Sequence, residues 1–215
     1  MPINAIFFDL DGTLLDTAAD IVGCMNKALE ELNLSTDGFM EKFRIGPPLA
    51  QAVKEALPDI QDDQIEQFIV RFRHLYDTTD YPNTVPYEGV EEMLAELKRQ
   101  KRRLFIATNK RMVPTIRLVQ KFCWEPLFDE VLTFDMFPGR KLSKVEMLTE
   151  AISRNGLTVE GSAMIGDAAT DVQAGNDSGL TSVAVTWGYD SPASLAAANP
   201  DWTMERVEEL FHLLK

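Results

Sequence analysis

The chain has 215 residues, of which 45% are hydrophobic and 26% are charged, the ordinary composition of a globular protein. That length suits one domain, or a domain that carries a smaller inserted one. The 34 acidic and 21 basic residues give a formal net charge of −13, which argues against a nucleic-acid partner and against anchoring on an anionic membrane. It does not exclude an anionic substrate, because a bound divalent cation can invert the local field.

The start of the chain, MPINAIFFDLDG, lacks the basic segment and the long apolar run of a secretory signal peptide. No apolar stretch approaches the roughly 18 residues that a membrane span needs. The sequence therefore predicts a cytoplasmic protein without a membrane partner. Its two cysteines, Cys24 and Cys123, lie far apart and outside any CxxC pattern, which argues against a disulfide framework and against structural zinc.

A strand buried on both faces is predicted near the start of the chain, where the apolar run AIFFDL is followed by Asp and Gly. Residues 16–86 then break the pattern of strands. Apolar residues recur there at the spacing of amphipathic helices, as in DIVGCMNKALEEL and DDQIEQFIVRFRHLY, and turn-rich segments separate these stretches. This region is predicted to be a helical domain inserted after the first strand.

From residue 87 onward, strand-like and helix-like segments alternate. Short apolar runs predict strands at 103–109, 130–134, 162–167 and 182–188, and amphipathic stretches predict helices at 89–100, 113–122 and 143–156. Such alternation indicates a Rossmann-like α/β fold, with a parallel sheet that carries helices on both faces. Residues 1–15 and 87–215 would form this core domain, and residues 16–86 a small α-helical cap domain.

Polar residues stand where three of the predicted strands end. They are Asp9 and Asp11, Thr108 and Asn109, and Asp167 with Asp171 in the following turn. Because ligands of open parallel α/β sheets bind outside the carboxyl ends of the strands, we expect these side chains to share one site. Asp9 and Asp11 are two residues apart in an extended segment, so both can face that site.

Several carboxylates at one place repel one another unless one is protonated or a cation binds. Mg²⁺ suits a site with few carboxylates, water and a substrate phosphate, and Gly12 could expose backbone N–H groups to that anion. An aspartate can attack phosphorus, and a second carboxyl group can carry the proton. A lysine can neutralise the transferring group; Lys141 and Lys144 both follow the strand at 130–134 and are open alternatives.

Four motifs in this order, DLDGTLLDT, ATN, a downstream lysine and GDAATD, resemble those of the haloacid dehalogenase superfamily of phosphatases. The resemblance covers almost the whole chain and implies Mg²⁺ as cofactor. The inserted helical region is similar to the small cap of subfamily I. PYEGV, TNK, VTWGYD and IGPPL resemble segments of the phosphoglycolate phosphatase-like group.

The resemblance implies roles for individual residues. Asp9 would be the nucleophile and Asp11 the general acid and base. Thr108 would contact the phosphoryl group, with Asn109 beside it. Asp9, the main-chain carbonyl of Asp11, and Asp167 would be the ligands of Mg²⁺.

Asp171 would support the site by holding the lysine. The related proteins usually write the lysine motif Lys-Pro-x-Pro, whereas this chain has Lys141-Leu-Ser-Lys144 without prolines. Lys144 is favoured as the lysine that contacts the phosphoryl group because it opens the predicted helix, and Lys141 is the rival.

Three further residues are candidates for substrate selectivity. Arg44 and Gly46 lie in the cap segment RIGPPL, where Arg44 could bind an anionic group of the substrate; a solvated surface arginine is the simpler interpretation. Trp187 follows a predicted strand and could line the entrance to the site or pack in the core, and the same holds for Tyr189 two residues later.

The predicted activity is therefore Mg²⁺-dependent hydrolysis of small phosphomonoesters, phosphoglycolate phosphatase-like, through an aspartyl-phosphate. A phosphomutase similar to β-phosphoglucomutase, or a pyrophosphatase or nucleotidase, would use the same fold. A non-catalytic phosphate-binding or regulatory protein is the alternative from a different class. The expected partner is a small phosphorylated metabolite, and both a monomer and a homodimer are compatible with the sequence.

Overall fold

The computed structural model of the chain describes residues 3–35, 39, 43, 45 and 49–213. The chain folds into two compact units. The sheet unit comprises Met1–Asp16 and Val85–Lys215, and the helical unit comprises Thr17–Thr84. Among the described helices, none combines the length and the hydrophobicity that crossing a bilayer requires.

Six parallel strands form the centre of the sheet unit, in the order β5-β4-β1-β6-β7-β8. Their bounds are β1 Ala5–Phe8, β4 Arg103–Thr108, β5 Glu130–Thr133, β6 Ser162–Gly166, β7 Thr181–Val185 and β8 Trp202–Met204. The chain builds outward from β1 on one side through β4 and β5, and on the other through β6 to β8. This reversal of strand order creates the crevice in which open α/β sheets bind ligands, at the carboxyl ends of β1 and its neighbours.

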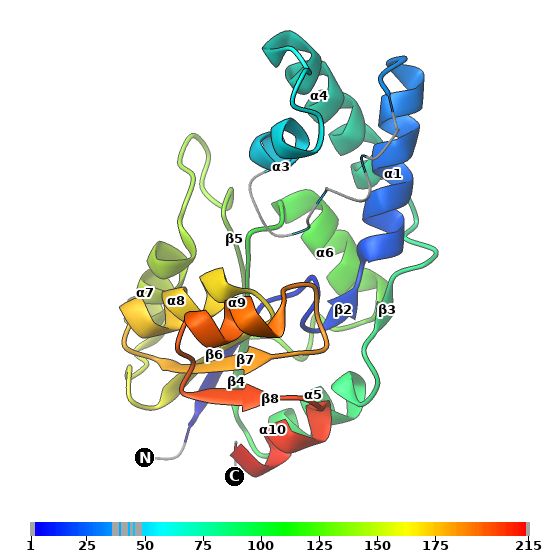
Figure 1. Cartoon of the computed structure of the whole chain (residues 1–215). Helices are drawn as coiled ribbons and strands as arrows, with labels where there is room; N and C mark the ends of the chain where they lie inside the picture. Colours follow the sequence, from blue (N-terminus) through cyan, green and yellow to red (C-terminus); the bar gives the residue numbers. More distant parts are fainter. Residues whose placement is uncertain (1–2, 36–38, 40–42, 44, 46–48, 214–215) are drawn as a thin grey trace. The chain divides into compact units, whose positions relative to one another are not determined.

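Helices cover both faces of this sheet, which confirms the predicted fold class (Figure 1). The helices of the sheet unit are α5 Val90–Arg99, α6 Met112–Lys121, α7 Lys144–Asn155, α8 Ala169–Asp177, α9 Pro192–Ala197 and α10 Val207–Leu213. The first turn of α7 is fixed by a reciprocal cap, because Ser143 N donates to the Glu146 carboxylate (2.7 Å) and Glu146 N donates to Ser143 Oγ (3.2 Å). This cap fixes the backbone at the start of α7, and so fixes the position from which the side chain of Lys144, the first residue of α7, extends.

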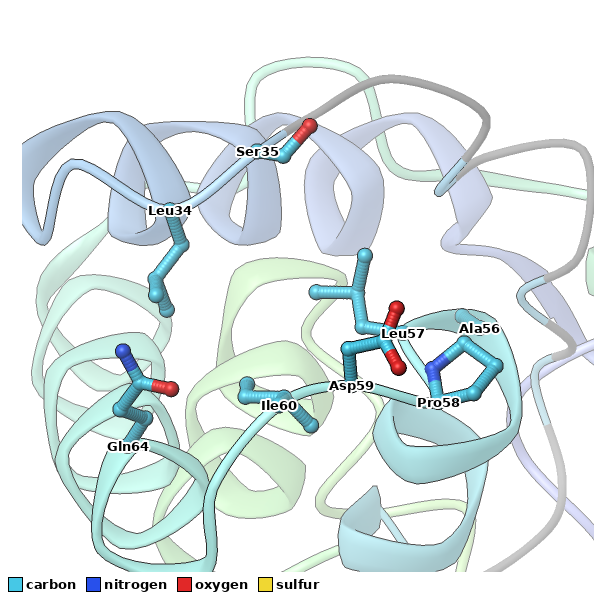
Figure 2. A pocket seen from close by; sticks show the side chains of 8 residues that line it. All are labelled: Leu34, Ser35, Ala56, Leu57, Pro58, Asp59, Ile60 and Gln64. Carbon is cyan, nitrogen blue, oxygen red and sulfur yellow. The ribbon is translucent and has the colours of Figure 1, made fainter.

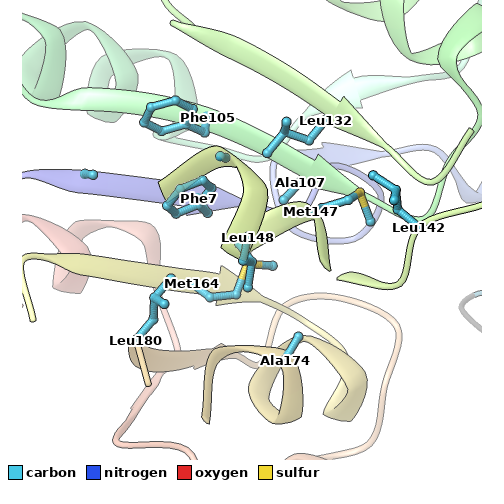
Figure 3. Close-up of a cluster of buried hydrophobic side chains, with 12 residues drawn as sticks. Phe7, Phe105, Ala107, Leu132, Leu142, Met147, Leu148, Met164, Ala174 and Leu180 are labelled. Atoms are coloured by element: carbon cyan, nitrogen blue, oxygen red, sulfur yellow. The ribbon is translucent and has the colours of Figure 1, made fainter. Parts of the chain in front are cut away.

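A core of fully buried side chains fixes the central strands beneath α7 and α8 (Figure 3). Phe7 of β1 stacks on Phe105 of β4 with ring centroids 4.7 Å apart, and the two residues are direct partners in the strand register. Met147 and Leu148 of α7 pack against them, both with 0% exposure. Close packing of this kind holds the ends of β1 and β4 at a fixed separation.

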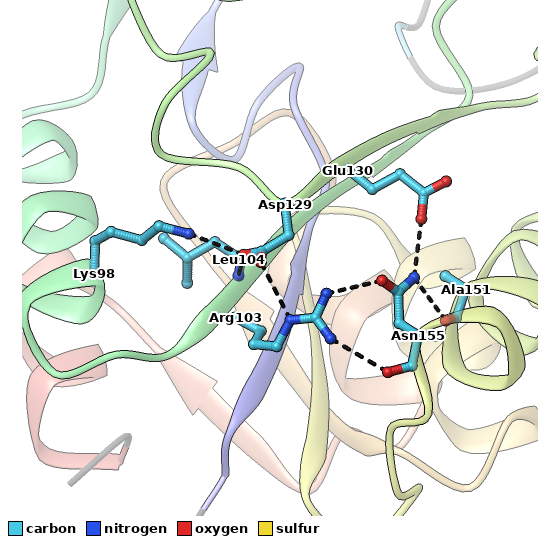
Figure 4. A network of polar contacts seen from close by, with 7 residues as sticks. All are labelled: Lys98, Arg103, Leu104, Asp129, Glu130, Ala151 and Asn155. Atoms are coloured by element: carbon cyan, nitrogen blue, oxygen red, sulfur yellow. Dashed lines mark hydrogen bonds and ion pairs between the residues drawn. The ribbon is translucent and has the colours of Figure 1, made fainter.

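A second set of contacts ties the opposite ends of the strands to the helices (Figure 4). The Asp129 carboxylate accepts hydrogen bonds from Lys98 of α5 (2.9 Å), from Arg103 (3.2 Å) and from the N–H of Leu104 in β4 (3.0 Å). Arg103 also donates to the side chain of Asn155 at the end of α7 (2.8 Å). Since Arg103 opens β4, this network lies at the amino end of the strand, away from the polar carboxyl ends.

The helical unit is built from α1 Ala18–Glu31, α3 Leu49–Ala56 and α4 Asp62–Thr78. Its core is a run of aromatic contacts that links Phe39, Phe68, Phe72, Tyr76 and Tyr81 in sequence. A pocket opens elsewhere in this unit, lined by Leu34, Ser35, Ala56, Leu57, Pro58, Asp59, Ile60 and Gln64 (Figure 2). Apolar and aromatic packing along α4 therefore accounts for the amphipathic pattern of this stretch.

The chain leaves and re-enters the sheet unit through a short antiparallel ribbon. It consists of β2 Leu15–Asp16 and β3 Val85–Pro86, with Leu15 opposite Pro86 and Asp16 opposite Val85. Tyr87 N extends the ribbon by donating to Leu14 O (3.1 Å). The ribbon thus holds together two positions of the sheet unit that lie on either side of the helical unit in sequence.

Candidate active site

The carboxyl ends of three adjacent strands bring the expected polar side chains to one place. Asp9 follows β1, Thr108 ends β4 and Asp167 follows β6. Their exposed fractions are 8%, 1% and 3%. Because β1 lies between β4 and β6 in the sheet, the three residues come from neighbouring strand ends.

The ammonium group of Lys144 lies between two carboxylates of this group. Its Nζ donates to Asp9 Oδ1 (2.8 Å) and also pairs with Asp171 Oδ1, and the Lys144 side chain is only 5% exposed. A cation at the first position of a helix is disfavoured by the helix dipole, so the two carboxylates must offset that cost. Lys141, by contrast, is exposed, so of the two lysines it is Lys144 that lies in the site.

Asp167 is held by a donor on each oxygen. Thr13 Oγ donates to Oδ1 (2.9 Å) and the N–H of Tyr189 donates to Oδ2 (2.8 Å). Gly12 and Gly188 both pack so closely against this carboxyl group that a Cβ at either position would collide with it. Gly12 also has φ +85°, a left-handed conformation that other residues adopt at a cost.

Asp9, Asp167 and Asp171 offer carboxylate oxygens that all lie within 4.8 Å of one another. Burial raises the pKa of Asp9 to about 8 and that of Asp167 to about 6. Burial lowers the pKa of Lys144, but the charges of Asp171 and Asp9 outweigh that effect and raise it. One ammonium group cannot neutralise three buried carboxylates, so the donor set fits a hard divalent cation with oxygen ligands.

Asp11, two residues after Asp9, has its own cation. Nζ of Lys110 lies 2.8 Å and 3.0 Å from the two carboxylate oxygens of Asp11, and the two side chains are 6% and 15% exposed. The N–H of Lys110 donates to Thr108 Oγ (3.1 Å). Sequence reasoning noted TNK as a family-like tripeptide but did not select Lys110 as a site residue.

The loop after β7 supplies further contacts, whose partners the sequence did not indicate. Nε1 of Trp187 donates to the main-chain oxygen of Thr13 (3.0 Å), and the Tyr189 hydroxyl donates to Asp16 Oδ1 (3.0 Å). Asp190 accepts from the N–H of Ala169 at the start of α8 (3.0 Å). Trp187 therefore contacts the segment that carries Thr13, and its role in substrate selectivity stays a prediction.

The other residues selected from the sequence are Asn109 in the sheet unit and Arg44 and Gly46 in the segment 44–49. Asn109 is exposed beside buried Thr108. Arg44 and Gly46 lie outside the described residues, so their proposed contact with substrate stays a prediction. Asp135, which was not selected from the sequence, fixes the loop after β4, because its Oδ1 accepts from the N–H of Met112 (2.8 Å) and from Thr133 Oγ (3.0 Å).

Comparison with known proteins agrees with this geometry. Residues 6–185 match the family model described as haloacid dehalogenase-like hydrolase. The chain belongs to this family. The finding confirms the predicted superfamily and the predicted class of hydrolase.

Similar members of the haloacid dehalogenase-like hydrolases carry several names. A phosphoglycolate phosphatase from Chromobacterium violaceum is 30% identical, over 99% of this chain and 97% of that protein. The pyrophosphatase PpaX from Bacillus cereus is 28% identical, over 100% of this chain and 97% of that protein. A solved haloacid dehalogenase-like family hydrolase from Streptococcus pneumoniae superposes with a TM-score of 0.87 at 25% identity, over 99% of both chains.

Proposed function

We propose that this chain is an Mg²⁺-dependent phosphatase that hydrolyses small phosphomonoesters through an aspartyl-phosphate intermediate. The observation that carries the proposal is the pairing of buried Asp9 with Lys144 (2.8 Å), with Asp11 two residues further on and Asp167 at the next strand end. A nucleophile, a cation for the transferring group, and a separate carboxyl group for proton transfer are the three parts that this chemistry needs. The relatives named phosphatase support the same reaction class.

In the first step, a carboxylate oxygen of Asp9 attacks phosphorus and the bond from phosphorus to the ester oxygen breaks. The Asp11 carboxyl group gives its proton to the departing oxygen, so the alcohol leaves neutral. In the second step, Asp11 takes a proton from water while the water oxygen attacks the phosphorus of the aspartyl-phosphate. The bond between phosphorus and Asp9 breaks, which releases inorganic phosphate and regenerates both carboxyl groups.

The other residues orient the Asp9 carboxylate and neutralise the charge of the phosphoryl group. Lys144 holds Asp9 and can pair with phosphoryl oxygens, while the Thr108 hydroxyl accepts from Lys110 N and can donate its own proton to a phosphoryl oxygen. Asp9, Asp167 and the main-chain carbonyl of Asp11 would hold Mg²⁺, which supplies positive charge to the carboxylates and the phosphate. Asp171 is engaged by Lys144 and by the N–H of Ala168 (3.1 Å), which supports a holding role for it.

The leaving group is the least constrained part of the proposal. We assign its selection to the helical unit acting as a cap, and we take a small phosphorylated metabolite of the cytoplasm as the substrate class. The related phosphoglycolate phosphatase and pyrophosphatase suggest the panel to test: phosphoglycolate, pyrophosphate, sugar phosphates and nucleotides. Phosphate release from a sugar phosphate, rather than its isomerisation, would separate a phosphatase from a phosphomutase.

The test measures phosphate release from p-nitrophenyl phosphate and from this panel, with Mg²⁺ and with EDTA. We expect release by the wild type only with Mg²⁺, and none by Asp9→Asn, because an amide is not a nucleophile. Asp177→Asn, the same change at an exposed residue of α8, serves as the matched control and should keep full activity. Near-full activity of folded Asp9→Asn, or a folded wild type that releases no phosphate from any ester, would overturn the proposal.

A further inference from the structure

Tyr189 contacts two parts of the sheet unit through its two ends. Its main-chain N–H donates to Asp167 Oδ2 (2.8 Å), and its hydroxyl donates to Asp16 Oδ1 (3.0 Å). Asp16 lies in the β2–β3 ribbon, 173 residues away in sequence from Tyr189. One residue therefore joins a carboxylate of the candidate cation site to the ribbon through which the chain enters the helical unit.

A second tyrosine completes the polar chain. The side chains of Tyr87 and Tyr189 are hydrogen-bonded, and burial together with the charges of Asp16 and Asp167 raises the pKa of Tyr87. Tyr87 therefore stays protonated. The Tyr189 side chain thus contacts Asp16 of β2 and Tyr87, the residue that follows β3.

The backbone around Tyr189 leaves little freedom at Asp167. Gly188 packs directly against the carboxyl group, and Asp190 accepts from Ala169 N at the start of α8 (3.0 Å). The main-chain N–H of Tyr189, between Gly188 and Asp190, can point at Asp167 only while the loop keeps this backbone conformation. The hydroxyl bond to Asp16 holds the loop from the ribbon side, in addition to the bond from Trp187 Nε1 to the main-chain oxygen of Thr13 (3.0 Å).

We propose that Tyr189 is a positioning residue for the cation site, and that its bond to Asp16 orients the loop whose N–H fixes the Asp167 carboxylate. The inference rests on the proposed function, because it concerns the site assigned to Mg²⁺. Partners that orient a metal ligand are commonly worth tenfold or more in affinity. Tyr189 acts on Asp167 through its own backbone, so loss of its hydroxyl should weaken Mg²⁺ binding without removing a ligand.

The experiment measures the Mg²⁺ dissociation constant by titration calorimetry for the wild type, Tyr189→Phe, Asp16→Ala and the double variant. We expect each single change to raise the dissociation constant about 10-fold. The double variant should bind Mg²⁺ no more weakly than the single variant with the larger dissociation constant, because both changes remove the same bond. Tyr76→Phe, the same loss of a hydroxyl in the helical unit, is the matched control and should leave the dissociation constant within twofold.

Urea unfolding of the same proteins separates positioning from stability. A purely structural role would lower the unfolding midpoint and leave Mg²⁺ binding unchanged. A dissociation constant within twofold of wild type for Tyr189→Phe would overturn the inference, and so would single effects that multiply in the double variant. A folded wild type that binds no Mg²⁺ would overturn the proposed cation site itself, and this inference with it.

Discussion

The ammonium group of Lys144 donates a 2.8 Å hydrogen bond to Oδ1 of Asp9, although 135 residues separate the two in sequence. Both side chains are buried, so the contact exists only when α7 is docked on the ends of the strands. It joins the candidate nucleophile to the cation that would neutralise the transferring group.

We expect Lys144→Met to lower kcat by about 100-fold or more, because it removes that cation and leaves buried Asp9 without its ammonium partner. Steady-state kinetics with p-nitrophenyl phosphate measures the effect. Lys141→Met is the control, since Lys141 is exposed and should change kcat by less than about twofold. The reverse pattern would assign the third motif to Lys141.

Mg²⁺ binding should weaken as the pH falls. Burial raises the pKa of Asp9 to about 8 and that of Asp167 to about 6, so the metal-free site holds protons that Mg²⁺ must displace. Calorimetry in buffers of different ionisation enthalpy should detect proton release, and the apparent affinity should fall between pH 8 and pH 6. Affinity that does not change over this interval would contradict these protonation states.

The same shifts have a consequence for stability. A carboxyl group whose pKa is raised by folding binds its proton more tightly when folded, so the metal-free protein should lose stability as the pH rises from 3.8 towards about 8. Adding Mg²⁺ should raise Tm most at the upper end of that range. Asp9→Asn should flatten the pH dependence of Tm in the metal-free protein.

Gly12→Ala should abolish most of the activity. The new Cβ would collide with the Asp167 carboxyl group, and the left-handed backbone at φ +85° disfavours alanine. Gly23→Ala is a matched control, because Gly23 is an exposed position of α1 with open space around it. That variant should keep its activity and gain about 0.5–1 kcal/mol in the free energy of unfolding.

Lys110→Met should lower kcat more for esters with poor leaving groups than for esters with good ones. Lys110 fixes both oxygens of Asp11, and displacement of a general acid matters most when the departing oxygen needs a proton. We expect about a 10- to 100-fold fall in kcat for an alkyl phosphate, and a much smaller fall for p-nitrophenyl phosphate, whose phenolate leaves readily. Lys98→Met, which removes the ion pair with Asp129, is the control. Equal losses on both esters would exclude this role.

Asp20→Ala should destabilise the helical unit. The buried carboxylate of Asp20 accepts from the N–H of Asn83 (3.1 Å) and from Thr84 Oγ (2.7 Å), which ties the start of α1 to the end of this unit. Leaving these donors without a carboxylate should cost about 2–4 kcal/mol in the free energy of unfolding. Glu66→Ala at an exposed position of α4 should cost less than about 0.5 kcal/mol. Urea unfolding followed by circular dichroism measures both.

The parts of the fold that could be predicted from the sequence are those in which a local pattern determines the structure. The central strands are apolar throughout because both faces are covered, and the helices between them are amphipathic. The edge strand β8 was not predicted, because Trp202–Met204 has only three residues and two of them are exposed. The β2–β3 ribbon, with two residues in each strand, is too short for any periodicity to show.

The residues of the candidate site also divide into those that could be predicted from the sequence and those that could not. Asp9, Thr108 and Asp167 stand at strand ends, so topology alone brings them together. Lys110 was not selected, and Tyr189 was considered only as a residue at the entrance or in the core, because their roles depend on which way a side chain or a loop turns after its strand. Nothing local in the sequence indicates that Tyr189 meets Asp16, since that contact forms only after β7 has joined the sheet and the ribbon has closed.

The strand order has a consequence for how activity can be used as a measurement. Asp9 and Asp167 are presented by β1 and β6, two strands that pair directly although the intervening chain contains the entire helical unit and four other strands. Contacts this distant in sequence are slow to form, because a long loop must close first. Regain of turnover after dilution from urea should therefore lag behind regain of helical circular dichroism, which makes enzyme activity a stringent reporter of complete folding of the sheet unit.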